Sequence, residues 1–172
     1  MPLLFAILTL GLLGFAAWRD LATRTIPNQV SLALAVLGLA FRLTQGWPAA
    51  LLSIAVAAAL FVIMLLCHAR GLIGGADVKL LTALALGLPP LGSYQLVAAT
   101  ALAGGVLAVL YILLRRTMGR AGVPVMRGRP HRFAALRVAA VELWRIRRHG
   151  PLPYGVAIAV GGALVVLTSQ GS

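Results

Sequence analysis

The sequence predicts an all-α polytopic membrane protein with about six transmembrane helices. Hydrophobic residues make up 61% of the chain and the mean hydropathy is +1.00. Charged residues make up only 10%, whereas soluble domains carry about 25%. Long apolar runs also alternate with short breaks that contain glycine, proline and arginine. We therefore interpret residues 1–172 as a single membrane-embedded domain.

Six apolar segments predict the spans, since a spanning helix takes about 20 residues. They are Pro2–Trp18, Gln29–Phe41, Ala49–Cys67, Val78–Leu88, Tyr94–Leu114 and Leu152–Thr168. The first has Arg19 after it and no positive charge before it, which is the reverse of a secretory signal peptide, so we expect it to be retained. The fourth is short and ends at Pro89-Pro90, which cannot continue a helix.

The distribution of basic residues predicts the orientation. With six spans and the N-terminus outside, the cytoplasmic side holds fourteen of the 15 lysines and arginines, and the outer side holds only Arg42. The positive-inside rule favours this arrangement. Without the fourth span, the ten arginines between Arg115 and Arg148 would face outward, so we expect that span to cross.

The segment 115–150 is predicted to be a basic cytoplasmic loop between helices 5 and 6. Its apolar residues near Phe133 to Trp144 fall close to helical spacing, which is typical of an amphipathic helix on an anionic lipid surface. A solvated loop that only fixes orientation explains the same residues. Because its arginines adjoin apolar segments, membrane topology accounts for the net charge of +12, and nucleic acid is not an expected partner.

Acidic residues are rare in this chain, and two of the three adjoin apolar runs. Asp20 follows the first span and Asp77 opens the fourth, so the topology places both at the cytoplasmic boundary. Carboxylates at membrane depth are costly and usually functional. Two that lie close together share one proton. The third acid, Glu142, is explained by a surface ion pair with neighbouring arginines.

No cofactor or metal is predicted. The chain has one cysteine, Cys67, and its histidines His68, His131 and His149 lack metal-ligand spacing.

Two short segments surround the aspartates. Asp20 is followed by Arg24 and by Ile26-Pro27-Asn28, in which proline suits the first turn of a helix and asparagine caps its amides. As an alternative, Asp20 is a surface acid paired with Arg19 or Arg24.

The second segment runs from Gly71 to Lys79 and contains Gly74, Gly75 and Ala76 before Asp77. Its glycines allow the backbone to approach a reacting centre. Asp77 also suits the N-terminus of a helix, and Lys79 is either a partner of a carboxylate or an anchor at the inner face.

Three motifs in this order resemble the type IV prepilin peptidases, membrane aspartyl proteases of the GxGD class. They are Asp20 with Arg-x-Ile-Pro-Asn, the Gly74-Gly-Ala-Asp-Val-Lys loop, and Leu152-Pro-Tyr-Gly155, which opens the last span. The resemblance implies that Asp20 and Asp77 are the catalytic pair. It also implies that Gly74, Gly75, Ala76, Lys79, Pro27 and Asn28 support the substrate loop. Ala76 stands where the family usually has the second glycine.

The chain is similar to the short form of the family, found with tight-adherence (Flp-type) pilus systems, and N-methylation is not expected. The resemblance implies cleavage of prepilins, with a basic leader and an apolar helix, after a glycine at the cytoplasmic face of the bacterial inner membrane. Two alternatives from other classes are a proton- or ion-coupled transporter that uses the acid pair and a non-catalytic subunit of a pilus or secretion assembly.

Overall fold

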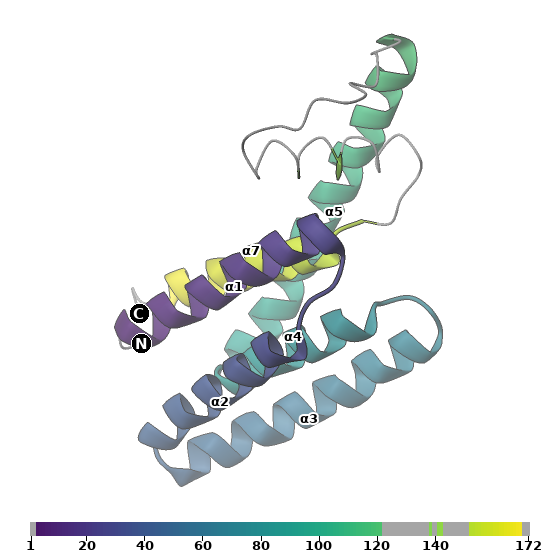
Figure 1. The fold of residues 1–172 in the computed structure, drawn as a ribbon. Coiled ribbons are helices and arrows are strands. Elements are labelled where there is room, and N and C mark those ends of the chain that lie inside the picture. Colours follow the sequence, from purple (N-terminus) through teal and green to yellow (C-terminus); the bar gives the residue numbers. More distant parts are fainter. Residues whose placement is uncertain (1–2, 122–137, 139–140, 143–151, 170–172) are drawn as a thin grey trace.

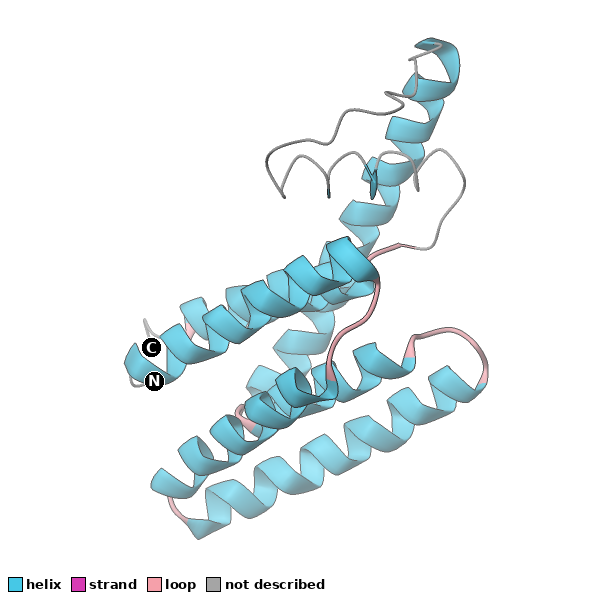
Figure 2. Ribbon diagram, viewed as in Figure 1, coloured by secondary structure: helices cyan, strands magenta, loops and turns pink. Residues whose placement is uncertain are grey.

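The computed structural model describes residues 3–121, 138, 141–142 and 152–169. These residues form six long helices and contain no strand (Figures 1 and 2). The helices are α1 (Leu3–Thr23), α2 (Asn28–Thr44), α3 (Trp47–Ala69), α4 (Gly75–Leu86), α5 (Pro90–Ala121) and α7 (Tyr154–Thr168). Each predicted apolar segment coincides with one helix, with bounds that differ by at most a few residues at most ends. The prediction of an all-α protein is confirmed.

The largest deviations lie at the ends of α1 and α5. α1 continues five residues beyond the predicted span, so Asp20 lies in its last turn rather than after it. α5 continues to Ala121, so the first seven residues of the predicted loop 115–150 are helical. Figure 1 shows this end of α5 extending beyond the other helices. The predicted amphipathic stretch lies outside the described residues, apart from Val138, Val141 and Glu142.

The helices form two groups around α4. α1 and α7 run side by side and antiparallel, and α5 packs along α7 (Figure 1). α2 and α3 form a hairpin against α4, and α4 also touches α5 and α7. All residues of α4 from 80 to 85 are buried, together with Val78. α4 is therefore the central helix of the molecule.

The central position of α4 explains its length and composition. Twelve residues make a helix of about 18 Å, less than the roughly 30 Å hydrocarbon core. Backbone polar groups in lipid must be satisfied internally, but a short helix with irregular ends is tolerated where protein surrounds it. α4 meets this condition because neighbouring helices cover it.

The outward faces of the molecule are apolar. Leu102 and Val106 on α5 are 72% and 69% exposed, and large apolar side chains are also exposed on α1, α2, α3 and α7. A soluble monomer rarely exposes so much contiguous apolar surface. Three helices are long and apolar enough to cross a membrane: Leu3–Thr23, Trp47–Ala69 and the Pro90–Thr117 part of α5. The chain therefore has the surface of a membrane protein.

Arg42, predicted to lie alone on the outer side, is buried at the α2–α3 turn. It is 7% exposed, and its Nε donates to Ser53 Oγ at 2.7 Å. Ser53 Oγ in turn donates to the Leu88 carbonyl at 2.9 Å. This chain of hydrogen bonds ties the α2–α3 hairpin to the segment that follows α4.

Close contacts between helices occur at glycines. A Cβ at Gly161 on α7 would lie 2.6 Å from the backbone N of Thr100 on α5. A Cβ at Gly38 on α2 would lie 2.7 Å from the backbone N of Gly87, just after α4. Membrane helices associate through such small residues because lipid supplies no hydrophobic driving force between them.

Candidate active site

Asp20 lies in the last turn of α1, with its side chain directed into the protein. The residue is 7% exposed, and its Oδ2 has no hydrogen-bond partner within the described chain. α1 ends at Thr23, and the Arg24 amide donates to the Asp20 carbonyl at 2.9 Å. The alternative of a surface acid is therefore wrong. A buried carboxylate oxygen without a protein partner has a lone pair available for a water or a proton.

Asp77 lies in the first turn of α4. Gly74 precedes the helix as its N-cap, and the Gly74 amide interacts with the Asp77 carboxylate. An acid at the third helical position that reaches back to the N-cap amide is half of a capping box. Asp77 therefore has a local structural role, and the same geometry fixes its carboxylate at the end of α4.

The N-terminus of α7 lies against Asp20. Gly155 packs on Asp20, so that a Cβ at Gly155 would lie 2.9 Å from Asp20 Oδ2 and 2.9 Å from Ile26 Cδ1. The Gly155 and Val156 amides interact with this carboxylate, although neither has full hydrogen-bond geometry to Oδ2. Free amides at the start of a helix favour a negative charge. The first turn of α7 is thus part of the environment of Asp20.

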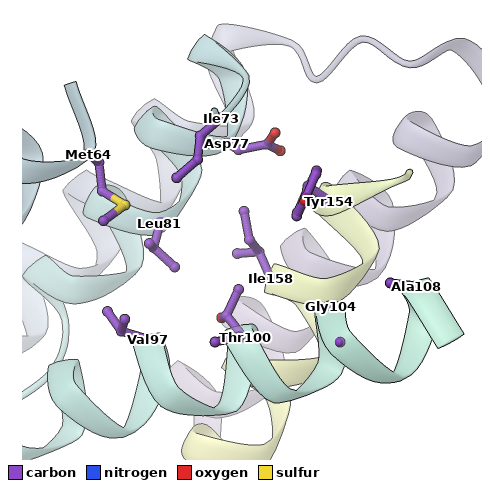
Figure 3. Close-up of a pocket in the computed structure, with 12 residues that line it drawn as sticks. Met64, Ile73, Asp77, Leu81, Val97, Thr100, Gly104, Ala108, Tyr154 and Ile158 are labelled. Carbon is purple, nitrogen blue, oxygen red and sulfur yellow. The ribbon is translucent and has the colours of Figure 1, made fainter. Parts of the chain in front are cut away.

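Asp77 opens onto a cavity of about 410 Å³. Tyr154, next to Gly155 in the chain, lines the same cavity, and Figure 3 shows Asp77 and Tyr154 at one end of it. Most of the remaining lining is apolar or small: Met64, Ile73, Leu81, Val97, Thr100, Ala101, Gly104, Gly105, Ala108 and Ile158. An apolar cavity with a carboxylate at one end has the size and composition of a ligand site.

The two carboxylates interact electrostatically. The negative charge of Asp20 acts on the Asp77 carboxylate, and the Gly74 amide favours the charged form of Asp77. Two carboxylates that repel each other in this way hold one proton between them more readily than none.

The predicted supporting residues have different roles. α2 begins at Asn28 after Pro27, as expected for the start of a helix. The prediction that Asn28 caps the helix is wrong, because no side-chain cap is present and Asn28 Oδ1 instead accepts a 3.2 Å hydrogen bond from Lys79 Nζ. Lys79 is exposed and joins α4 to α2.

The loop glycines also differ from one another. A Cβ at Gly74 would lie 2.8 Å from Asp77 Oδ2, whereas one at Gly75 would face the His68 ring at 3.4 Å. Ala76 is exposed. Gly74 is therefore the loop glycine in direct contact with an acid. The φ angles of Gly74 and Gly75 both lie outside the left-handed region.

Sequence reasoning missed the environment of Glu142. This residue is 9% exposed rather than on the surface, and its carboxylate accepts from both the Arg24 guanidinium and the Tyr111 hydroxyl. The prediction of a surface ion pair is thus wrong in its location. Arg24 and Glu142 are 118 residues apart, and no sequence pattern indicates such a pair.

No group of three or more possible metal ligands occurs among residues 3–121 and 152–169 or the few described between them. In a comparison with known protein families, residues 7–109, more than half of the chain, match the type IV leader peptidase family. The match includes Asp20, Asp77 and the loop before Asp77. Searches of curated proteins and of solved structures returned no significant match.

Proposed function

Because the chain belongs to the type IV leader peptidase family, a family of aspartic proteases, we propose that it is a membrane aspartyl endopeptidase that removes the leader of type IV prepilins of the Flp type. The bond cleaved follows a glycine at the cytoplasmic face of the bacterial inner membrane. The substrate has a basic leader and an apolar helix. The six helices cross the bilayer with the N-terminus outside. With this topology, the last turn of α1, the first turn of α7 and the start of α4 all lie at the cytoplasmic side.

The observation that carries this proposal is the position of the first turn of α7. Gly155 touches Asp20, and the adjacent Tyr154 lines the cavity onto which Asp77 opens. The first turn of α7 thus links Asp20 of α1 to the cavity beside Asp77 of α4, although the three helices are far apart in sequence. A transporter relay or an assembly subunit gives no reason for this cavity at an acid pair near one end of the helices.

The pair supplies the acid and the base that amide hydrolysis requires. The ionised carboxylate takes a proton from a water molecule, whose oxygen attacks the carbonyl carbon of the scissile bond. The protonated carboxyl donates its proton to the reacting amide, the C–N bond breaks, and the new amine and carboxylate leave. Burial and the mutual repulsion of the acids keep one of them protonated. The roles belong to the pair as a unit.

The apolar cavity suits the apolar part of such a substrate. A helical peptide must unwind before water can reach its carbonyl carbon. In this proposal, the small residues Gly74, Gly75 and Ala76 beside Asp77 form the mobile part of the site and accommodate the unwound strand. The exposed Arg116 of α5 is available to anionic lipid at the inner leaflet.

The test is cleavage of a prepilin-like substrate by purified protein in detergent, with the new N-terminus mapped by mass spectrometry. We expect Asp20→Asn and Asp77→Asn each to reduce cleavage at least about 100-fold, as expected for loss of an acid–base group. The double variant is expected to be no worse than either single one, because each removes half of one unit. Arg116→Gln, which removes an exposed charge on α5, is the control and keeps its activity. Near-normal cleavage by either Asn variant would falsify the mechanism.

A further inference from the structure

Arg24, Glu142 and Tyr111 form a buried polar cluster beside Asp20. Glu142 Oε1 accepts from the Arg24 guanidinium and from the Tyr111 hydroxyl. The side chains of Arg24 and Glu142 are 18% and 12% exposed, and Tyr111 is 6% exposed. The cluster joins the end of α1, the middle of α5 and the segment between α5 and α7. Surface ion pairs contribute little, but groups at this level of burial require their partners.

The backbone of Arg24 is strained. Its φ is +57°, in the left-handed region, and within the described chain it is the only residue other than glycine with a positive φ. Its amide donates to the Asp20 carbonyl at 2.9 Å, which is the left-handed cap that usually takes glycine. An arginine at this position costs about 1–2 kcal/mol relative to right-handed backbone. Such strain is retained where the side chain is needed.

The Arg24 side chain is next to the acid that the mechanism uses. The charges that act on Asp20 include Arg24, just after the end of its own helix, and Glu142 from the segment before α7. Asp20 in turn acts on Asp77 of α4. The guanidinium of Arg24 binds Glu142 rather than Asp20. Its positive charge therefore acts on Asp20 from a fixed position, and Glu142 and Tyr111 determine that position.

We propose that Glu142 is a positioning residue for the peptidase reaction, which holds the Arg24 guanidinium beside Asp20 with the help of the Tyr111 hydroxyl. The inference rests on the proposed function, because it assigns a role relative to the acid pair. Glu142 contacts neither substrate nor the reacting atoms; it acts through Arg24. Its loss frees the guanidinium to move, and the last turn of α1 that carries Asp20 then loses its tether to α5.

The variants Glu142→Gln, Arg24→Gln and their double combination test this proposal by steady-state cleavage of one prepilin-like substrate. We expect each single variant to lower kcat about tenfold with KM changed less than about threefold, because the change affects the reacting pair and not substrate binding. The double variant is expected to match the singles, since the two residues act through one another. Tyr111→Phe is expected to lower kcat in the same direction by a smaller factor.

Several outcomes overturn the proposal. The proposal fails if Glu142→Gln has the parental kcat, or if its kcat falls while that of Arg24→Gln does not. It also fails if the double variant shows the product of the two single reductions in kcat, or if the variants change only KM. Glu142→Asp retains the charge and is expected to recover part of kcat. If Glu142→Asp is folded but inactive, Arg24→Gln must be equally impaired. A milder loss in Arg24→Gln would then contradict the proposal. Thermal unfolding of every variant, with assays well below each midpoint, keeps a folding defect separate.

Arg116→Gln is the control, since it removes an exposed arginine from α5. Asp20→Asn separates the two proposals. If Asp20→Asn cleaves normally, the proposed function fails. If Asp20→Asn is inactive and Glu142→Gln is normal, only the positioning role fails.

Discussion

At the scale of single residues, the site depends on two glycines that leave space for the two acids. Gly155 touches Asp20, and Gly74 touches Asp77. In each case a methyl group would lie within 3 Å of the carboxylate, closer than real Cβ contacts allow. The requirement at these positions is for space and not for an unusual backbone angle, because neither glycine has a positive φ.

The first residue-scale prediction concerns Gly155. Gly155→Ala is expected to displace the Asp20 carboxylate and to lower kcat/KM about tenfold or more, since small misplacements of a reacting group have large effects on rate. Gly11→Ala on the same helix as Asp20 meets no atom within 4 Å and should retain full activity. Cleavage by Gly155→Ala at the parental rate would show that Asp20 tolerates displacement.

The second concerns the loop before Asp77. Gly74→Ala is expected to lower activity, because its methyl group would lie 2.8 Å from Asp77 Oδ2. Ala76→Gly, which introduces the residue usual in the family, should retain activity because Ala76 is exposed. The change is expected to reduce helix stability by no more than about 1 kcal/mol. If Gly74→Ala cleaves the substrate as fast as Ala76→Gly and the parent protein, a direct effect of Gly74 on Asp77 is excluded.

At the scale of elements, the position of α7 depends on its contact with α5. Gly161 allows the α7 backbone to approach Thr100, and α7 in turn carries Gly155 to Asp20. A contact within the bundle is thus coupled to the site through one helix.

Gly161→Ala is therefore expected to destabilise the protein. The new methyl group would lie 2.6 Å from a backbone atom of α5, so that the helices must separate, at a cost of about 1–3 kcal/mol. Thermal unfolding in detergent measures the effect. Gly14→Ala, with no atom within 4 Å of the added methyl group, is the matched control and should not lower the midpoint. An unchanged midpoint in Gly161→Ala would indicate that α5 and α7 separate at little cost.

At the scale of the whole molecule, the charge distribution and the helix order predict one orientation in the membrane. In this orientation, fourteen of the 15 lysines and arginines lie on the cytoplasmic side, as the positive-inside rule expects. The remaining one, Arg42, is buried in a turn and is hydrogen-bonded there.

Single-cysteine labelling tests this orientation in intact cells. In a Cys67→Ser background, Leu91→Cys at the start of α5 should react with a membrane-impermeant maleimide from outside. Arg116→Cys near the other end of α5 should react only after the membrane is opened. Both positions are exposed, so a difference reports the side of the membrane. Reaction of Arg116→Cys in intact cells would reverse the topology and place the acid pair at the outer face.

The sequence by itself determined the all-α class, the six apolar segments and the family. Helical segments in a membrane are marked by composition over about 20 residues, and the three motifs are local in sequence. The family comparison confirmed the resemblance over residues 7–109. These properties depend on short stretches of chain, and each stretch carries its own signal.

Only the tertiary structure decided what surrounds the two acids. It placed α4 at the centre, Gly155 against Asp20, and Glu142 between Arg24 and Tyr111. Each of these contacts joins residues far apart in the chain. Glu142 illustrates the reason: a carboxylate among arginines resembles a surface ion pair in sequence, because local charge indicates neither burial nor the partner that packing brings to it.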